Sequence, residues 1–268
     1  QGLCKADELC VNANGQPNLD QLQELAQGAD GLFLMAANNE TGVLHDMDAI
    51  SRIVDTSDIR WHCDAVQLLG KQRLNFGSDS WRSVSSASVS AHKLGGPPGC
   101  GALILNSPAL PSMAAMPTNT TMDAIGIVGF AAATEELDKR LTQAETIAQL
   151  RDYLEEQLLE RYPSSVIHGK ATMRLNNTSA VSLKNAQGWA DGEDLVLSLA
   201  EFGICVSTGA ACSTGSGSPS HVLLAMGVEP EQASASLRIS LGPETTKNDV
   251  ALLIRSLARV FPSPVEGR

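Results

Sequence analysis

The sequence predicts an α/β protein, with a mostly parallel sheet in its first half and a smaller α+β unit in its second half. Short apolar runs of strand length alternate with segments of helical periodicity over the first hundred or so residues. Most of these runs end in polar clusters, as the strands of an open α/β sheet do. The chain has 268 residues, enough for one large domain or two modest ones.

The first elements are predicted from periodicity and capping. Leucines spaced three residues apart indicate a helix over 18–25. The continuous apolar run 31–36 has the length of a strand, and the segment 46–54 has helical spacing behind aspartates that can cap a helix. These three elements form a helix–strand–helix succession.

Two further strands and a return strand complete the first half. The strand 59–63 delivers Asp64 at its C-terminal end, and the run 83–89, rich in Ser and Val, forms the next strand. Gly and Pro crowd the segment 95–101, so we expect a turn there and a return strand over 102–105.

A long helical stretch separates the two halves. It runs from 123 to 161, and we expect a break in it around 138–142. We place the domain boundary near residue 145, which gives a large domain over 1–145 and a small C-terminal domain over 146–268. The segment 106–121 has little pattern and is predicted to be a surface loop.

The second half carries short strands and helices without the regular alternation of the first. The predicted strands are 179–183, 204–207 and 237–240, and the predicted helices are 193–201, 219–226 and 247–260.

Composition excludes several classes of partner. Nineteen Lys and Arg against thirty Asp and Glu give a net charge of −11, which argues against sequence-independent binding of nucleic acid or of an anionic membrane. No apolar run is long enough for a membrane-spanning helix. The six cysteines include no C-x-x-C pair, so we predict no metal site and expect reduced thiols in a cytoplasmic protein.

Polar clusters follow three of the predicted strands, at 38–40, 64–67 and 90–93. Each alone is explained by ordinary turn formation, but three at consecutive strand ends favour a ligand site. The amine of Lys93 and the carboxylate of Asp64, one strand apart, are the groups that pyridoxal phosphate requires. Spacing alone leaves both explanations open.

A cysteine and an arginine in the second half are further candidates. Cys212 lies among small, flexible residues, as a mobile nucleophile would, although a surface loop with an incidental cysteine has the same composition. Cys63 and Cys205, in apolar strands, are predicted to be core residues. Arg238 lies between apolar neighbours and requires an anionic partner, either an internal carboxylate or the carboxylate of a substrate.

Six segments together resemble the motifs of the cysteine desulfurases, which are class V aminotransferase-fold enzymes that use pyridoxal phosphate. They are 37–42 (ANNETG), 62–67 (HCDAVQ), 90–99 (SAHKLGGPPG), 207–212 (STGAAC), 219–227 (PSHVLLAMG) and 238–242 (RISLG). They occur in family order over essentially the whole chain, and the cysteine segment is similar to the branch with a long mobile loop. The resemblance implies the type I fold of pyridoxal-phosphate-dependent transferases.

The resemblance assigns cofactor contacts to five positions. Lys93 is similar to the Schiff-base lysine, and Asp64 to the carboxylate under the pyridine nitrogen. Gln67 matches the amide that bonds the phenolic oxygen of the ring. Ser90 and His92 match groups that hold the phosphate.

It also assigns the substrate side of the site. Asn39 is similar to the asparagine shared by cofactor and substrate carboxylate, and Arg238 to the clamp on that carboxylate. Cys212 matches the nucleophile, and Thr121 the threonine that reaches the cofactor phosphate of the partner subunit. The implied activity converts L-cysteine to L-alanine and leaves a persulfide on Cys212. A homodimer would then pass this sulfur to scaffold or relay proteins for iron–sulfur clusters or tRNA thiolation.

Two departures from the family pattern keep alternatives open. The family's N-terminal stretch, with phosphate contacts and a histidine that stacks on the ring, has no counterpart here, and the segment 110–121 replaces a glycine-rich one. We therefore expect either a fragment or a degenerate homologue. The alternatives to a desulfurase are another pyridoxal-phosphate C–S or C–Se lyase of the same fold, which does not need Cys212, and a non-catalytic homologue.

Overall fold

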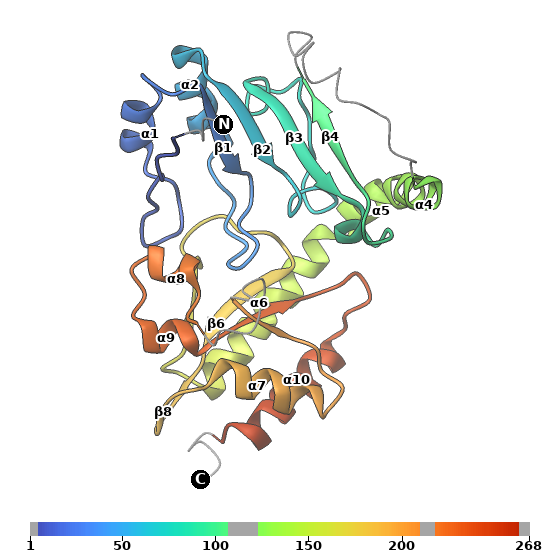
Figure 1. Ribbon diagram of the computed structural model, residues 1–268. Coiled ribbons are helices and arrows are strands. Elements are labelled where there is room, and N and C mark those ends of the chain that lie inside the picture. Colours follow the sequence, from blue (N-terminus) through green and yellow to red (C-terminus); the bar gives the residue numbers. More distant parts are fainter. Residues whose placement is uncertain (1–4, 107–122, 210–217, 263–268) are drawn as a thin grey trace. The chain divides into compact units, whose positions relative to one another are not determined.

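The computed structural model describes residues 5–106, 123–209 and 218–262 (Figure 1). The chain divides into two compact units. The first contains residues 1–10, 17–37 and 45–142, and the second contains 11–16, 38–44 and 143–268. Two short segments of the first half therefore belong to the second unit, an arrangement that the two predicted ranges 1–145 and 146–268 did not anticipate.

The first unit is built on a four-stranded sheet in the order β1-β2-β3-β4. Its strands are β1 (Gly31–Met35), β2 (Arg60–Asp64), β3 (Val84–Ser90) and β4 (Gly101–Leu105). The first three run parallel and β4 returns antiparallel, which confirms the predicted mostly parallel sheet. Trp61, Cys63 and Ala87 on one face are completely buried, whereas Phe33 on the other face is 82% exposed.

Helices α1 (Leu19–Leu25) and α2 (Met47–Ser57) begin where capping residues predict. The Asn18 side chain accepts a hydrogen bond from the backbone N–H of Gln21 at 3.1 Å, and the Asp46 side chain accepts one from Ala49 at 2.9 Å. Both helices were predicted, and the structure confirms them.

The long helical stretch is divided differently from the prediction. It consists of α4 (Ala124–Glu135), α5 (Leu137–Thr142) and α6 (Ala144–Arg161), so the breaks lie at Glu136 and Gln143. The predicted break over 138–142 is wrong, because those residues form the short helix α5 itself.

The second unit contains a four-stranded antiparallel sheet in the order β5-β6-β10-β9. Its strands are β5 (Val166–Ile167), β6 (Thr178–Ser182), β9 (Ser207–Thr208) and β10 (Ser236–Ser240), and a separate hairpin is formed by β7 (Lys184–Asn185) and β8 (Gly188–Trp189). Its remaining helices are α7 (Gly192–Ala200), α8 (His221–Ala225), α9 (Pro230–Ser234) and α10 (Lys247–Val260). This confirms the α+β class of the second half.

Two local predictions in this unit are wrong. The predicted strand 204–207 is reduced to Ser207–Thr208, and Cys205 is exposed rather than part of a core. The predicted helix 219–226 is confirmed as α8, which begins at His221 because the Ser220 side chain caps it by accepting from the N–H of Leu223 at 3.1 Å.

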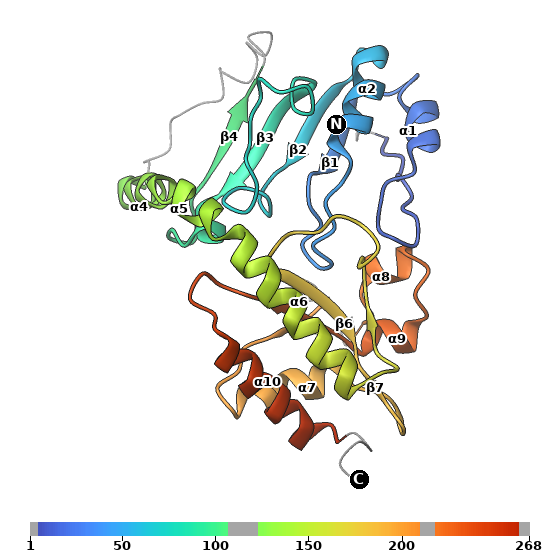
Figure 2. The same cartoon turned by 180° about the vertical axis from the view of Figure 1, so that it is seen from behind.

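One apolar core holds the second unit together. Leu154 and Leu158 of α6 pack with Leu199 of α7, Leu237 of β10 and Leu257 of α10, all of them fully buried. Figure 2 shows α6 lying along β6, with α7 and α10 beside it. The helices thereby cover one face of the small sheet.

A buried ion pair lies in the same unit. Arg174 donates two hydrogen bonds to the Glu155 carboxylate, at 2.7 and 3.0 Å, and only 5% and 2% of the two side chains are exposed. Ser179 donates a third hydrogen bond to Glu155, at 2.8 Å. The charge of the buried Glu155 carboxylate is thus balanced by Arg174, and its oxygens are hydrogen-bonded in place of water.

His168, which follows β5, is buried and makes the stability of the protein depend on pH. Burial lowers the pKa of its imidazole from 6.5 to about 4. Between these two values the unfolded chain binds a proton that the native protein does not. We therefore expect the free energy of unfolding to fall by about 3 kcal/mol as the pH drops from roughly 6.5 to 4.

Urea unfolding of the native sequence and of His168→Gln over this pH range checks the prediction. The variant should lose that part of the pH dependence, whereas His92→Gln, at an exposed histidine, should keep it. Equal pH dependence in all three proteins would contradict the prediction.

None of the helices within the described ranges is long and apolar enough to cross a bilayer.

Candidate functional site

Lys93 lies immediately after β3, on a single 3-10 turn that spans Ala91–Leu94. This turn was not predicted. It ends at Gly95, whose φ of +78° is a left-handed conformation that favours glycine, and the N–H of Gly96 closes back onto the carbonyl of Ala91 at 3.0 Å. The Lys93 side chain is exposed, and no described residue forms a hydrogen bond or ion pair with its amine.

Helix α4 packs against the 3-10 turn that carries Lys93 and the residues that follow it. Pro97 packs against Gly129 so closely that a Cβ at position 129 would lie 2.8 Å from the Pro97 ring. A glycine in the helix is therefore required for the close approach. The turn that carries Lys93 is held by packing, while the amine stays free.

Asp64 is the last residue of β2, the strand next to β3, and Gln67 follows it. Asp64 pairs in register with Ser88, so β2 and β3 end side by side, as Figure 1 shows. The Asp64 carboxylate is exposed and accepts a hydrogen bond from the N–H of Val66 at 2.8 Å. Gln67 is half-buried and accepts one from Lys71 at 3.0 Å.

Ser90 and His92 complete the cluster in the first unit. The Ser90 hydroxyl and the Nδ1 atom of His92 are hydrogen-bonded at 2.7 Å. The structure therefore places five of the predicted cofactor residues at or just after the ends of two neighbouring strands, namely Asp64, Gln67, Ser90, His92 and Lys93.

This donor set fits pyridoxal phosphate. An unpartnered amine suits the aldehyde, a carboxylate suits the pyridine nitrogen, and an amide suits the phenolic oxygen. A hydroxyl paired with an imidazole offers donors for a phosphate. By contrast, no group of three or more His, Cys, Asp or Glu side chains is placed to hold a metal ion anywhere in the described parts of the chain.

Asn39 lies in a tight turn of the second unit. The Asn38 side chain shapes this turn by accepting from the N–H groups of Glu40 and Thr41, each at 2.9 Å, and the N–H of Gly42 donates to the Asn38 carbonyl at 3.0 Å. Asn39 is half-buried, and no described residue forms a hydrogen bond with its side-chain amide.

Arg238 on β10 contacts the same turn. One guanidinium nitrogen donates to the Asn39 carbonyl at 3.1 Å. No described carboxylate forms an ion pair with Arg238, so the internal salt bridge is absent from the described residues. The structure thus brings Arg238 and Asn39 together and leaves most of the guanidinium N–H groups without a described protein acceptor.

Glu40 is a residue of this site that the sequence analysis did not assign. Its carboxylate is 3% exposed and accepts a hydrogen bond from Ser220 at 2.5 Å. A Cβ at Gly209 would lie 2.7 Å from the same carboxylate. Gly209 and Ser220 lie on either side of Cys212 in the sequence. Glu40 therefore contacts one described residue before Cys212 and one after it.

Burial raises the pKa of Glu40, and the Ser220 hydrogen bond opposes this, as do the charges of His221 and Arg238. In the sequence, Glu40 is only a glutamate inside the 37–42 motif. An exposed turn residue and a buried, hydrogen-bonded carboxylate look the same there, so the sequence did not single Glu40 out.

The conformation of Gly42, in the turn that the Asn38 side chain shapes, predicts the effect of a substitution there. Gly42 has a φ of +74°, and a Cβ there would lie 2.9 Å from the Cβ of Thr178. Gly203 has the same φ, but a Cβ at that position would meet no described atom within 4 Å. We expect Gly42→Ala to destabilise the protein by about 1–3 kcal/mol more than Gly203→Ala, because both strain the left-handed backbone but only Gly42→Ala overpacks.

Urea unfolding of both variants measures this difference. Equal destabilisation by the two variants would contradict the prediction, because it would mean that the turn accommodates a Cβ beside Thr178 at no cost in free energy.

Cys212 and Thr121 lie outside the described residues, as does the predicted loop 106–121 beyond Asn106. The predicted core position of Cys63 is confirmed.

Comparison with known proteins agrees with this arrangement. The model of the aminotransferase class-V family matches residues 3–253. A cysteine desulfurase of Nostoc sp. is 36% identical over 267 residues, which cover 96% of this chain and 64% of that protein. A cysteine desulfurase IscS of Dictyoglomus turgidum is 35% identical, covering 94% of this chain and 65% of that protein.

Solved structures show the same likeness. The NifS-like protein of Rickettsia africae has a TM-score of 0.78 and 28% identity, covering 94% of this chain and 69% of that one. SspA in complex with cysteine has a TM-score of 0.69 and 26% identity, covering 90% and 67%. The chain spans less than two thirds of the length of the two cysteine desulfurases. It belongs to the class V aminotransferase family.

Proposed function

We propose that this protein is a pyridoxal-phosphate-dependent cysteine desulfurase that converts L-cysteine to L-alanine and keeps the sulfur as a persulfide on Cys212. The observation that carries the proposal is the cluster after β2 and β3, where an exposed, unpartnered amine follows one strand and a carboxylate ends the next. The similarity to cysteine desulfurases selects this activity among those of the family.

The residues of the first unit would hold the cofactor. Lys93 would bind its aldehyde carbon, Asp64 its pyridine nitrogen and Gln67 its phenolic oxygen. Ser90 and His92 would hold the phosphate, and Thr121 a phosphate of the partner subunit. The cofactor, when bound, supplies a ring that withdraws electrons from the substrate α-carbon.

The residues of the second unit would hold the substrate and receive its sulfur. Arg238 has free N–H groups with which to clamp the α-carboxylate, and Asn39 has a free amide beside it. The Cys212 thiolate would attack the substrate sulfur. The substrate Cβ–S bond breaks and a Cys212 S–S bond forms, while a proton completes the methyl group of alanine, so no oxidant or reductant is needed.

We further propose that the protein acts as a homodimer in the cytoplasm. The apolar residues Ile125 and Val128 of α4 are 85% and 68% exposed, which supports a contact with another chain. The described cysteines are all free thiols, which fits a reducing compartment. The persulfide would pass to a scaffold or relay protein, for iron–sulfur clusters or tRNA thiolation.

Trapping the cofactor tests the proposal. Pyridoxal phosphate added to the protein should produce a visible absorption band, and borohydride reduction followed by peptide mapping should find the label on Lys93. Lys93→Ala should abolish the band and the label, whereas Lys139→Ala, at an exposed lysine paired with Glu136, should keep both. A protein that takes up no cofactor would support the non-catalytic alternative instead.

A further inference from the structure

Lys71 holds the side-chain amide of Gln67 in one orientation. Its Nζ atom donates a hydrogen bond to the Oε1 atom of Gln67 at 3.0 Å, and both side chains are half-buried. The amide nitrogen of Gln67 meets no described acceptor. An ammonium has three donors and no acceptor, so it can bind only the oxygen end of an amide.

This pairing decides which end of the Gln67 amide is left for a ligand. With Oε1 bonded to Lys71, the end that remains available is the Nε2 atom, which has two N–H donors. The phenolic oxygen of pyridoxal phosphate, which the proposed function assigns to Gln67, requires a donor. An amide turned the other way would set oxygen against oxygen and would leave its nitrogen facing the ammonium, donor against donor.

The backbone after β2 brings the two side chains together. The N–H of Leu69 donates to the carbonyl of Ala65 at 3.2 Å, and the N–H of Lys71 donates to the carbonyl of Leu68 at 3.0 Å. These bonds wind the segment into successive turns, and side chains four positions apart can meet on such turns. Gln67 and Lys71 have this separation.

The same segment packs directly on the turn that carries Lys93. Gly70, the neighbour of Lys71, has a φ of +80°, and a Cβ there would lie 2.6 Å from the Cδ2 atom of Leu94. Leu94 follows Lys93 in the chain and is 1% exposed. The amide of Gln67 is therefore oriented on a segment that is itself packed against the Lys93 turn.

We infer that Lys71 is a positioning residue for the cofactor. Its ammonium fixes the Gln67 amide so that the N–H groups, and not the oxygen, are presented to the phenolic oxygen of pyridoxal phosphate. The inference rests on the proposed function and deepens it, because it names the group that orients one of the cofactor contacts. Fixing the amide before the cofactor binds removes the cost of ordering it during binding.

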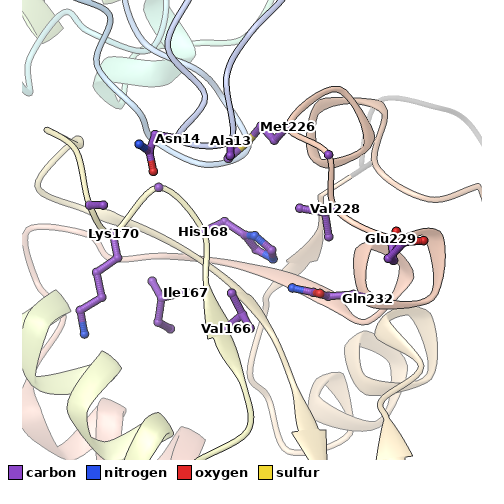
Figure 3. Close-up of a pocket in the computed structure, with 13 residues that line it drawn as sticks. Ala13, Asn14, Val166, Ile167, His168, Lys170, Met226, Val228, Glu229 and Gln232 are labelled. Carbon is purple, nitrogen blue, oxygen red and sulfur yellow. The ribbon is translucent and has the colours of Figure 1, made fainter.

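The dissociation constant of pyridoxal phosphate, measured from the absorbance of the bound cofactor, tests the inference. Lys71→Met should raise it about tenfold, as the loss of one hydrogen bond does, and Lys71→Arg, which keeps donors without an acceptor, should restore most of the affinity. Lys170 is a matched control, an exposed lysine of the second unit that lines a hollow of about 400 Å³ (Figure 3). Lys170→Met should leave the constant unchanged.

A double variant separates orientation of the amide from the charge of Lys71 alone. In the Gln67→Ala background, Lys71→Met should have no further effect, because no amide is left to orient. Equal weakening in both backgrounds would overturn the inference, since Lys71 would then act through its charge on the anionic cofactor. An unchanged dissociation constant in Lys71→Met would overturn it as well.

Two further measurements distinguish this result from failure of the proposed function and from misfolding. A native protein that carries the borohydride label on Lys93, together with an unaffected Lys71→Met, overturns the inference alone, whereas a native protein without the label overturns both. Urea unfolding without cofactor should give the same midpoint for Lys71→Met as for the native protein. If Lys71→Met does not fold, Lys71→Ala removes the ammonium in the same comparison.

Discussion

Replacing Cys212 by alanine is expected to lower the formation of alanine from L-cysteine by at least about 10³-fold, because removal of a covalent nucleophile leaves only the residual catalysis of the remaining site. The cofactor band should persist, since Lys93, Asp64 and Gln67 belong to the other unit. Alanine production and protein-bound persulfide, measured on protein loaded with pyridoxal phosphate, check the expectation.

A matched control is available within the chain. Cys205 is an exposed free thiol close to Cys212 in the sequence, and Cys205→Ala should keep both alanine production and the persulfide. If Cys212→Ala released sulfide from cysteine at an undiminished rate, the persulfide mechanism would be wrong and a C–S lyase of the same fold would replace it.

Replacing Arg174 by methionine is expected to destabilise the protein by about 3–5 kcal/mol. The Glu155 carboxylate is 2% exposed and would keep only the Ser179 hydrogen bond, so a buried charge would lose its cation. Urea unfolding measures the loss, and the unfolding midpoint should move strongly while activity assays of the folded fraction change little.

An exposed pair provides the control for this result. Arg82 bonds Asp55 at 2.8 Å, but the two side chains are 59% and 33% exposed. Arg82→Met should therefore cost only about 0–1 kcal/mol. The double variant Arg174→Met/Glu155→Gln should recover part of the stability, and a double variant as unstable as Arg174→Met alone would show that the cost comes from packing rather than from the uncompensated charge.

Much of the first unit follows from local sequence. Strand-length apolar runs and capping aspartates predicted β1, β2, β3 and α2, because burial and capping act over a few residues. The positions of Lys93 and Asp64 after neighbouring strands followed from the same pattern, since parallel strands end at one edge of a sheet.

Other features required the tertiary structure. Cys205 has apolar neighbours in sequence yet is exposed, because the strand that was expected to bury it is only Ser207–Thr208. The same applies to Arg238, for which the sequence left an internal carboxylate and a substrate carboxylate equally open. Only the structure shows that its contact is the Asn39 carbonyl, on a turn 199 residues away in the chain.

By itself, the sequence determined the α/β class, the mostly parallel sheet, and the chemical groups that follow its strands, because these depend on short-range periodicity and on residue type. The tertiary structure alone decided that Glu40 is buried against Ser220, that Glu155 is neutralised by Arg174, and that the buried His168 is hydrogen-bonded to Ser182. Each of these depends on contacts between distant segments, and the burial that gives such contacts their energetic weight is a property of the folded chain.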